Sequence, residues 1–183
     1  MMAKPPRRPD IPPRHSDNIK RRLMLNPDKR IIGVLIKRAC YGGYAKHKRH
    51  PAHFGMVPDR GLHEGDATLC DEHAGFGPQD CKRIPVLLRR GARAGLLGQD
   101  CRAGIPRVLW TIDDNGWIYE ARLTNHVACE YHGYPIRPSE AIARQVYERF
   151  SQWVEDCGVK EDRRAMIQCK VRYGIHSNER IQD

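Results

Sequence analysis

The chain has 183 residues, of which 40% are hydrophobic and 30% are charged, and its net charge is +10. This length suggests one domain, and no apolar run approaches the roughly 20 residues that a membrane-spanning helix needs. The first residues have no apolar core behind their charges, which argues against a secretory signal peptide. We therefore expect a cytoplasmic protein of bacterial type, or a nuclear one, without a membrane partner.

The positive charge is concentrated toward the amino end. The net charge is +4 over residues 1–28 and +7 over residues 29–60, whereas it is +1 over 61–112 and −2 over 113–183. One-sided charge of this kind is typical of proteins with a polyanionic partner.

The chain divides into an arm, a domain and a tail. Residues 1–17 hold five prolines and four basic residues, a composition that favours an extended and solvated chain. We expect a flexible, disordered basic arm at 1–25, a single domain at 26–176 and a frayed tail at 177–183. The alternative for the arm is a solubilising extension without a partner.

The first expected helix follows Asn26, a good N-cap, with Pro27 at its first position, and it ends at Gly42. Residues 43–78 then form a long loop rich in Gly, Pro and His, which is unusual inside a compact domain. A second helix is expected within 79–97. Pro85 places its true start near Ile84, and Gly91 would let another element approach closely.

A hairpin at 107–123 is the clearest structural pattern. Asn115-Gly116 is the preferred pair for a two-residue turn, which would place Ile112 opposite Tyr119. A further strand is expected to end at Pro135, a helix at 139–157 should follow Ser139, and weak alternation over 165–175 suggests a last strand. The sequence thus predicts an α+β fold: a small antiparallel sheet, made of the hairpin plus one or two further strands, packed on one face against two or three helices.

The stretch "GYAKHKRHPAHFG" at 43–55 could bind phosphates. Cations beside aromatic rings suit a single strand or an RNA loop, and cations alone suit any nucleic-acid backbone. A solvated basic surface is the alternative. The candidate nucleic-acid contacts are Lys37, Arg38, Tyr44, Lys46, His47, Lys48, Arg49, Arg89, Arg90 and Arg93.

The same loop could hold a structural zinc, which would explain how a long polar segment stays ordered. Cys70 and His73 have the C-x-x-H spacing of one zinc-binding pair, and Cys40 and His53 could complete the site. His47, His50 and His63 are further candidates. Against a metal, no second close Cys/His pair is unambiguous, and three cations stand nearby. The alternative is a buried Cys70 with solvated histidines.

A third hypothesis places catalysis on the hairpin face. Metal-independent RNA cleavage needs a base, an acid and a cation, and His132, Glu120 and Arg122 could supply them. The alternative is ordinary polarity on an exposed sheet, with Glu120 and Arg122 forming a salt bridge.

We expect the protein to bind RNA or DNA through its backbone, or a ribonucleoprotein assembly, with the basic amino-terminal third. The alternatives are a small metal-independent ribonuclease or toxin-type effector, and an interaction module for an acidic protein partner. Zinc is the one cofactor considered.

Overall fold

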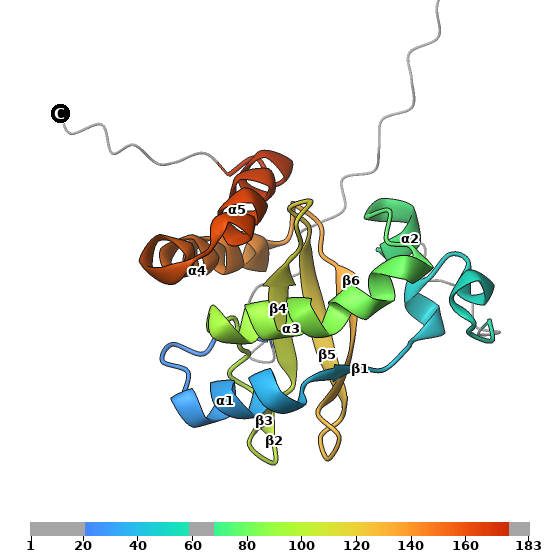
Figure 1. The fold of residues 1–183 in the computed structure, drawn as a ribbon, viewed down its shortest axis with the longest axis horizontal. Helices are drawn as coiled ribbons and strands as arrows, with labels where there is room; N and C mark the ends of the chain where they lie inside the picture. Colours follow the sequence, from blue (N-terminus) through green and yellow to red (C-terminus); the bar gives the residue numbers. More distant parts are fainter. Residues whose placement is uncertain (1–20, 59–67, 176–183) are drawn as a thin grey trace, which may run out of the picture.

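The computed structural model describes residues 21–58 and 68–175 and shows the expected α+β fold (Figure 1). The expected tail at 177–183 and most of the arm lie outside the described residues. The helices are α1 (Lys29–Arg38), α2 (Cys70–His73), α3 (Ile84–Arg93), α4 (Ala141–Cys157) and α5 (Lys160–Arg172). The strands are β1 (Cys40–Tyr41), β2 (Cys101–Arg102), β3 (Ile105–Pro106), β4 (Val108–Ile112), β5 (Ile118–Asn125) and β6 (Glu130–Pro135). Across the described ranges, no helix combines the length and the apolar character that a membrane crossing requires.

The main sheet has the strand order β1-β6-β5-β4. The antiparallel pairs β4–β5 and β5–β6 confirm the expected hairpin and the strand that ends at Pro135. The short edge strand β1 runs parallel to β6, so the sheet is mixed rather than wholly antiparallel. Because a long stretch of chain separates β1 from β6, no tight turn forces these two strands to run in opposite directions.

The register of the hairpin differs by one residue from the expectation. Ile112 pairs with Ile118 rather than with Tyr119. Beyond this pair, the Asp113 backbone N–H donates to the Trp117 carbonyl at 3.0 Å, which closes a three-residue loop at 114–116. The Asp113 carboxylate supports this loop by accepting hydrogen bonds from the backbone N–H groups of Asn115 and Trp117, at 3.0 and 2.8 Å. Gly116 has a φ of +80°, as a type I turn followed by a glycine bulge requires.

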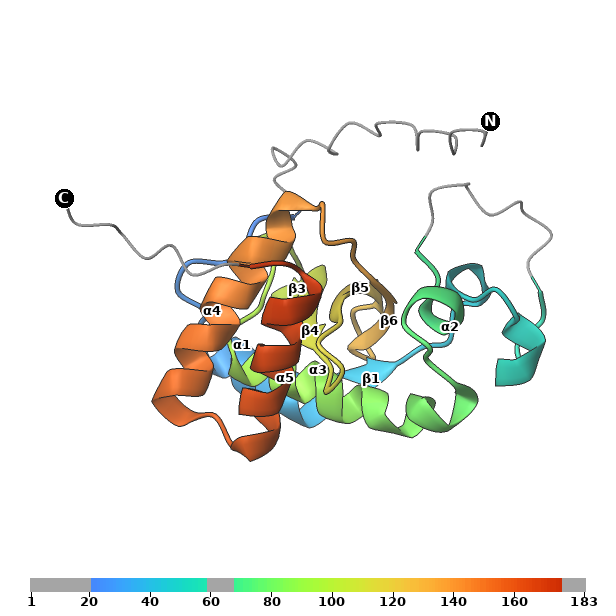
Figure 2. The same cartoon turned by 90° about the horizontal axis from the view of Figure 1, so that it is seen from above.

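Both faces of the sheet are buried, whereas the sequence predicted helices on one face only. Trp110 and Ile112 pack against α4 and α5. Leu109 and Ala121, which point the other way, pack against α1 and α3. Because both faces are covered, every residue of β4 is buried. Seen from above, α4 and α5 lie on one side of the strands and α2 lies on the other (Figure 2).

The observed helix boundaries correct two expectations. The N-cap of α1 is Asp28, whose carboxylate accepts the backbone N–H of Arg30 at 2.7 Å, so neither Asn26 nor Pro27 has its expected place. The start of α3 at Ile84 is as expected, and it ends at Arg93. The close approach at Gly91 is confirmed, because a Cβ atom there would lie 2.0 Å from the carbonyl oxygen of Trp110.

The expected last strand at 165–175 is wrong, because most of this segment belongs to helix α5. The Asp162 carboxylate accepts the backbone N–H of Val159 at 3.2 Å and caps the first turn. Asp162, Ala165 and Cys169 are buried at helical spacing. The residues between them are mostly exposed, so what looks like weak alternation is one buried stripe of a helix.

The described parts of the loop at 43–78 consist of short helical turns. These are 3₁₀ turns at Ala45–His47 (η2) and Pro51–Phe54 (η3), together with α2. The Asp71 carboxylate on α2 accepts the backbone N–H groups of Arg49 and His50, each at 2.8 Å. These bonds lower the pKa of Asp71, although burial alone would raise it. Hydrogen bonds therefore anchor the basic part of the loop to α2.

Candidate functional site

The pairing of β5 with β6 brings the three candidate catalytic residues together. Arg122 lies opposite His132, and Glu120 lies opposite Tyr134. Residues directly opposite one another share a face of the sheet, so four polar side chains gather on one face. The turn η2 adds two rings from the loop. We call this group the β5–β6 cluster, and it consists of Tyr44, His47, Glu120, Arg122, His132 and Tyr134.

Glu120 is the buried anion of the cluster, with 0% of its surface exposed. Its carboxylate accepts hydrogen bonds from the Tyr134 hydroxyl at 2.7 Å and from the Trp110 indole at 3.2 Å. Arg122 and Arg21 also donate to it, at 2.9 and 2.8 Å. Burial opposes the charge, but the two arginines and the Tyr134 hydroxyl outweigh this effect and lower the pKa of Glu120. A carboxylate engaged in this way is better suited to hold Arg122 and Tyr134 than to accept a proton.

The four rings of the cluster, those of Tyr44, His47, His132 and Tyr134, pack against one another. The His47 and His132 rings are stacked, with centroids 5.0 Å apart. His47 also lies 4.9 Å from Tyr134, and Tyr44 lies 4.5 Å from His132. Tyr44 is the most exposed of these rings, at 37%. The cluster therefore combines two imidazoles from different elements with an accessible aromatic face.

His132 is neutral near pH 7. Burial and, secondarily, the positive charge of Arg122 lower its pKa to about 4. Its Nδ1 atom is buried and has no hydrogen-bond partner among the described residues. Leaving a buried polar atom unpaired costs about 1–3 kcal/mol, and such atoms are often retained for function.

Arg122 is the most exposed charge in the cluster. About half of its side chain is open to solvent, although Glu120 fixes its Nε and Nη2 atoms. Its guanidinium carbon lies 5.8 Å from the centre of the Tyr134 ring. Both Glu120 and Tyr134 raise the pKa of Arg122 above its usual value, against the effect of burial. A positioned cation with an open face can receive a phosphate.

The candidate nucleic-acid contacts do not all reach the surface. Lys48 is only 2% exposed, and Arg90 is buried in ion pairs with Asp114 and Asp162, each at 2.8 Å. Because neither side chain reaches the surface, neither can touch a nucleic-acid backbone. The expectation that Lys48 and Arg90 contact nucleic acid is therefore corrected. Arg89 is half-buried. The exposed candidates are Lys37, Arg38, Tyr44, Lys46, Arg49 and Arg93.

The candidate metal ligands are not brought together. Cys70 donates to the carbonyl oxygen of Gly133 at 3.3 Å, and the His73 ring accepts the backbone N–H of Leu69 at 3.0 Å. Cys40 instead lies beside the Cys129 carbonyl, and His53 stacks on His50. Within the described ranges, no group of three His, Cys, Asp or Glu side chains could hold a metal ion. His63 lies outside those ranges, and all seven cysteines are free thiols.

Sequence reasoning missed three members of the site. It placed His47 and Tyr44 among the phosphate contacts and did not consider Tyr134, whereas the structure joins all three to His132. One signal was available, because residues 120 and 122 share a face, as do 132 and 134. If the two strands are joined by a short turn, an antiparallel register places 120 opposite 134 and 122 opposite 132, as the structure shows. The position of His47 depends on long-range packing of the loop.

Comparisons with known proteins give no further guidance. No protein-family model matches the chain, and neither curated proteins nor solved structures gave a match.

Proposed function

We propose that the protein binds RNA and cleaves its backbone without a metal, at the β5–β6 cluster. The observation that carries this proposal is the β5–β6 register, which sets Arg122 beside His132 and Glu120 beside Tyr134. The stacking of His47 on the same rings adds a second imidazole. Base, acid and cation are the groups that this reaction requires.

In this proposal, neutral His132 acts as the general base. It accepts the proton of the ribose 2′-hydroxyl while that oxygen attacks phosphorus. Its pKa of about 4 leaves it unprotonated across the physiological pH range. The cost is a weaker base than an ordinary imidazole, because catalysis is most efficient when the pKa lies near the working pH.

The remaining members of the cluster take the other roles. His47 donates a proton to the leaving 5′-oxygen, since the attacking and leaving oxygens need different partners on opposite sides of phosphorus. Arg122 stabilises the charge that develops on the phosphate, and Glu120 keeps Arg122 oriented. Tyr44 offers an exposed ring on which a base can stack.

Replacing His132 tests the proposal. With an RNA oligonucleotide in excess chelator, His132→Ala should lower kcat by about 10²–10⁴-fold, which is typical of losing a general base. His53→Ala is the matched control because His53 is an exposed histidine of the same loop, outside the cluster. Equal cleavage by both variants, with melting temperatures unchanged, would refute the assignment.

A second candidate function is nucleic-acid binding without cleavage, which the exposure of Lys37, Arg38 and Arg49 favours. Binding that falls with salt at a log–log slope of about −0.7 per phosphate contact on single strands, with no cleavage, would support it. The interaction module for an acidic protein stays a prediction. It requires co-purification of such a protein after nuclease treatment.

A further inference from the structure

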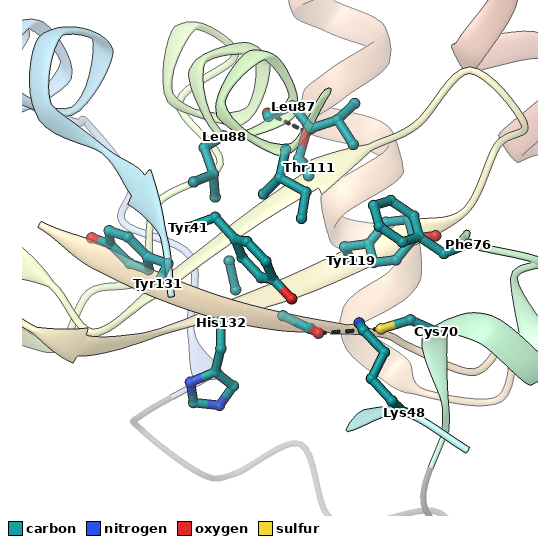
Figure 3. Close-up of a pocket in the computed structure, with 13 residues that line it drawn as sticks. Tyr41, Lys48, Cys70, Phe76, Leu87, Leu88, Thr111, Tyr119, Tyr131 and His132 are labelled. Carbon is teal, nitrogen blue, oxygen red and sulfur yellow. Dashed lines mark hydrogen bonds between the residues drawn. The ribbon is translucent and has the colours of Figure 1, made fainter. Parts of the chain in front are cut away.

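A small cavity lies on the face of the sheet that α3 covers, and His132 is the one member of the β5–β6 cluster that contributes to its lining. Its volume is about 40 Å³. Figure 3 shows His132 below β6, on the side away from Leu87, Leu88 and Thr111. The side chains that matter for its chemistry are Tyr41, Lys48, Cys70, Phe76 and Tyr119.

Lys48 is a buried cation in the wall of this cavity. Its amine lies 4.7 Å from the centre of the Phe54 ring and 5.5 Å from that of Phe76. No carboxylate of the described residues forms an ion pair with it. The carboxylate of Asp71, the residue that follows Cys70 in the chain, is engaged by the backbone of Arg49 and His50. A buried charge without a counter-charge is costly, and aromatic rings offset only part of that cost.

The other polar groups of the cavity are mainly donors. The Tyr41 hydroxyl points toward the Lys48 amine (Figure 3). Within the described ranges, the buried Tyr119 hydroxyl has no hydrogen-bond partner. Burial raises the pKa of the Cys70 thiol to about 11, although Lys48 acts to lower it. Cys70 is therefore a neutral thiol, and it donates to the Gly133 carbonyl. It does not supply the missing negative charge.

We propose that this cavity binds a small monovalent anion, such as chloride or formate, against the Lys48 amine and the Tyr41 hydroxyl. Its volume suits a group of one to three heavy atoms, which excludes a phosphodiester. A water molecule would fit but would leave the lysine charge without a counter-charge. The site does not depend on the proposed RNA cleavage.

Thermal unfolding at constant ionic strength tests this assignment, with chloride or formate exchanged for gluconate, which is too large to enter. The melting temperature should rise saturably with chloride or formate, by about 5–10 °C at a hundred times the dissociation constant. Lys48→Met should abolish this dependence, because it keeps the length of the side chain and removes its charge. Lys82→Met, at an exposed lysine of the turn Pro78–Arg83, should retain it.

Two outcomes would overturn the proposal. In one, wild type melts at the same temperature in all three salts while Lys48→Met is destabilised equally in each, which means that the chain itself satisfies the ammonium. In the other, crystals grown in bromide show anomalous scattering only at the surface. A bromide peak beside the Lys48 amine would support the site directly, even if the variant fails to fold.

Discussion

His132 should make the protein less stable as the pH falls from about 7.5 to about 5. In the folded protein its pKa is lowered to about 4, whereas the ordinary value of 6.5 applies in the unfolded chain. Above pH 6.5 the ring is neutral in both states and contributes no difference. Between these two values the unfolded chain takes up a proton that the folded protein resists, so stability declines as the solution becomes more acidic.

The size of this effect follows from the difference of about 2.5 pH units between the two pKa values. At about 1.4 kcal/mol per unit, the full difference corresponds to at most about 3.4 kcal/mol. Only part of it is reached at pH 5, and the ring is partly exposed to screening solvent. We therefore expect a loss of about 1–2 kcal/mol between the two pH values.

Urea denaturation of wild type and His132→Gln at both pH values isolates this contribution, because glutamine cannot take up the proton. The free energy of unfolding of wild type should fall by about 1–2 kcal/mol more than that of the variant. His53→Gln, at an exposed histidine, should behave like wild type. If wild type and His132→Gln lose the same stability, the burial of His132 beside Arg122 does not control its protonation.

Three further changes test the packing and the proposed binding. Glu120→Gln should lower the free energy of unfolding, measured by urea denaturation, by about 3 kcal/mol, because it leaves two arginines beside a neutral buried group. A change below about 1 kcal/mol would mean that the Glu120 charge is not needed for stability. Gly91→Ala should destabilise the fold by about 1–3 kcal/mol, because the added Cβ would meet the Trp110 carbonyl. Gly33→Ala, which has open space around it, should instead stabilise the fold by about 0.5–1 kcal/mol. Equal effects of the two variants on the melting temperature would contradict the close approach at Gly91. Tyr44→Ala should raise KM for RNA about 5–150-fold while kcat stays within a few-fold, as the loss of one stacked base predicts; an unchanged KM would exclude stacking on this ring.

Local patterns in the sequence predicted much of the fold. The start of α3, the hairpin and the strand that ends at Pro135 depend on residues close together in the chain, such as Pro85 and the turn around Gly116. The hairpin register was missed because hydrogen bonds from the backbone to the Asp113 carboxylate favour a three-residue loop over the two-residue turn. Residues 165–175 were misread because alternation in a short segment does not separate a strand from the buried stripe of a helix.

The site was harder to predict than the fold. Charge patterning treated Lys48 and Arg90 as surface cations, yet the rings of Phe54 and Phe76 cover the first. Asp162, 72 positions away in the sequence, pairs with the second. Such long-range partners are not visible in a single sequence. The candidate residues Glu120, Arg122 and His132 lie together because they stand on adjacent strands, where alternation fixes which side chains share a face.

Cleavage of a DNA oligonucleotide that contains one ribonucleotide, in excess chelator, tests the central proposal most directly. Only the ribose carries the attacking 2′-hydroxyl, so we predict a cut immediately 3′ of it and a product that ends in a 2′,3′-cyclic phosphate. Wild type should produce it, and His132→Ala should not. An intact substrate would contradict the proposed reaction, as would cleavage of the all-DNA control or equal cleavage by His132→Ala.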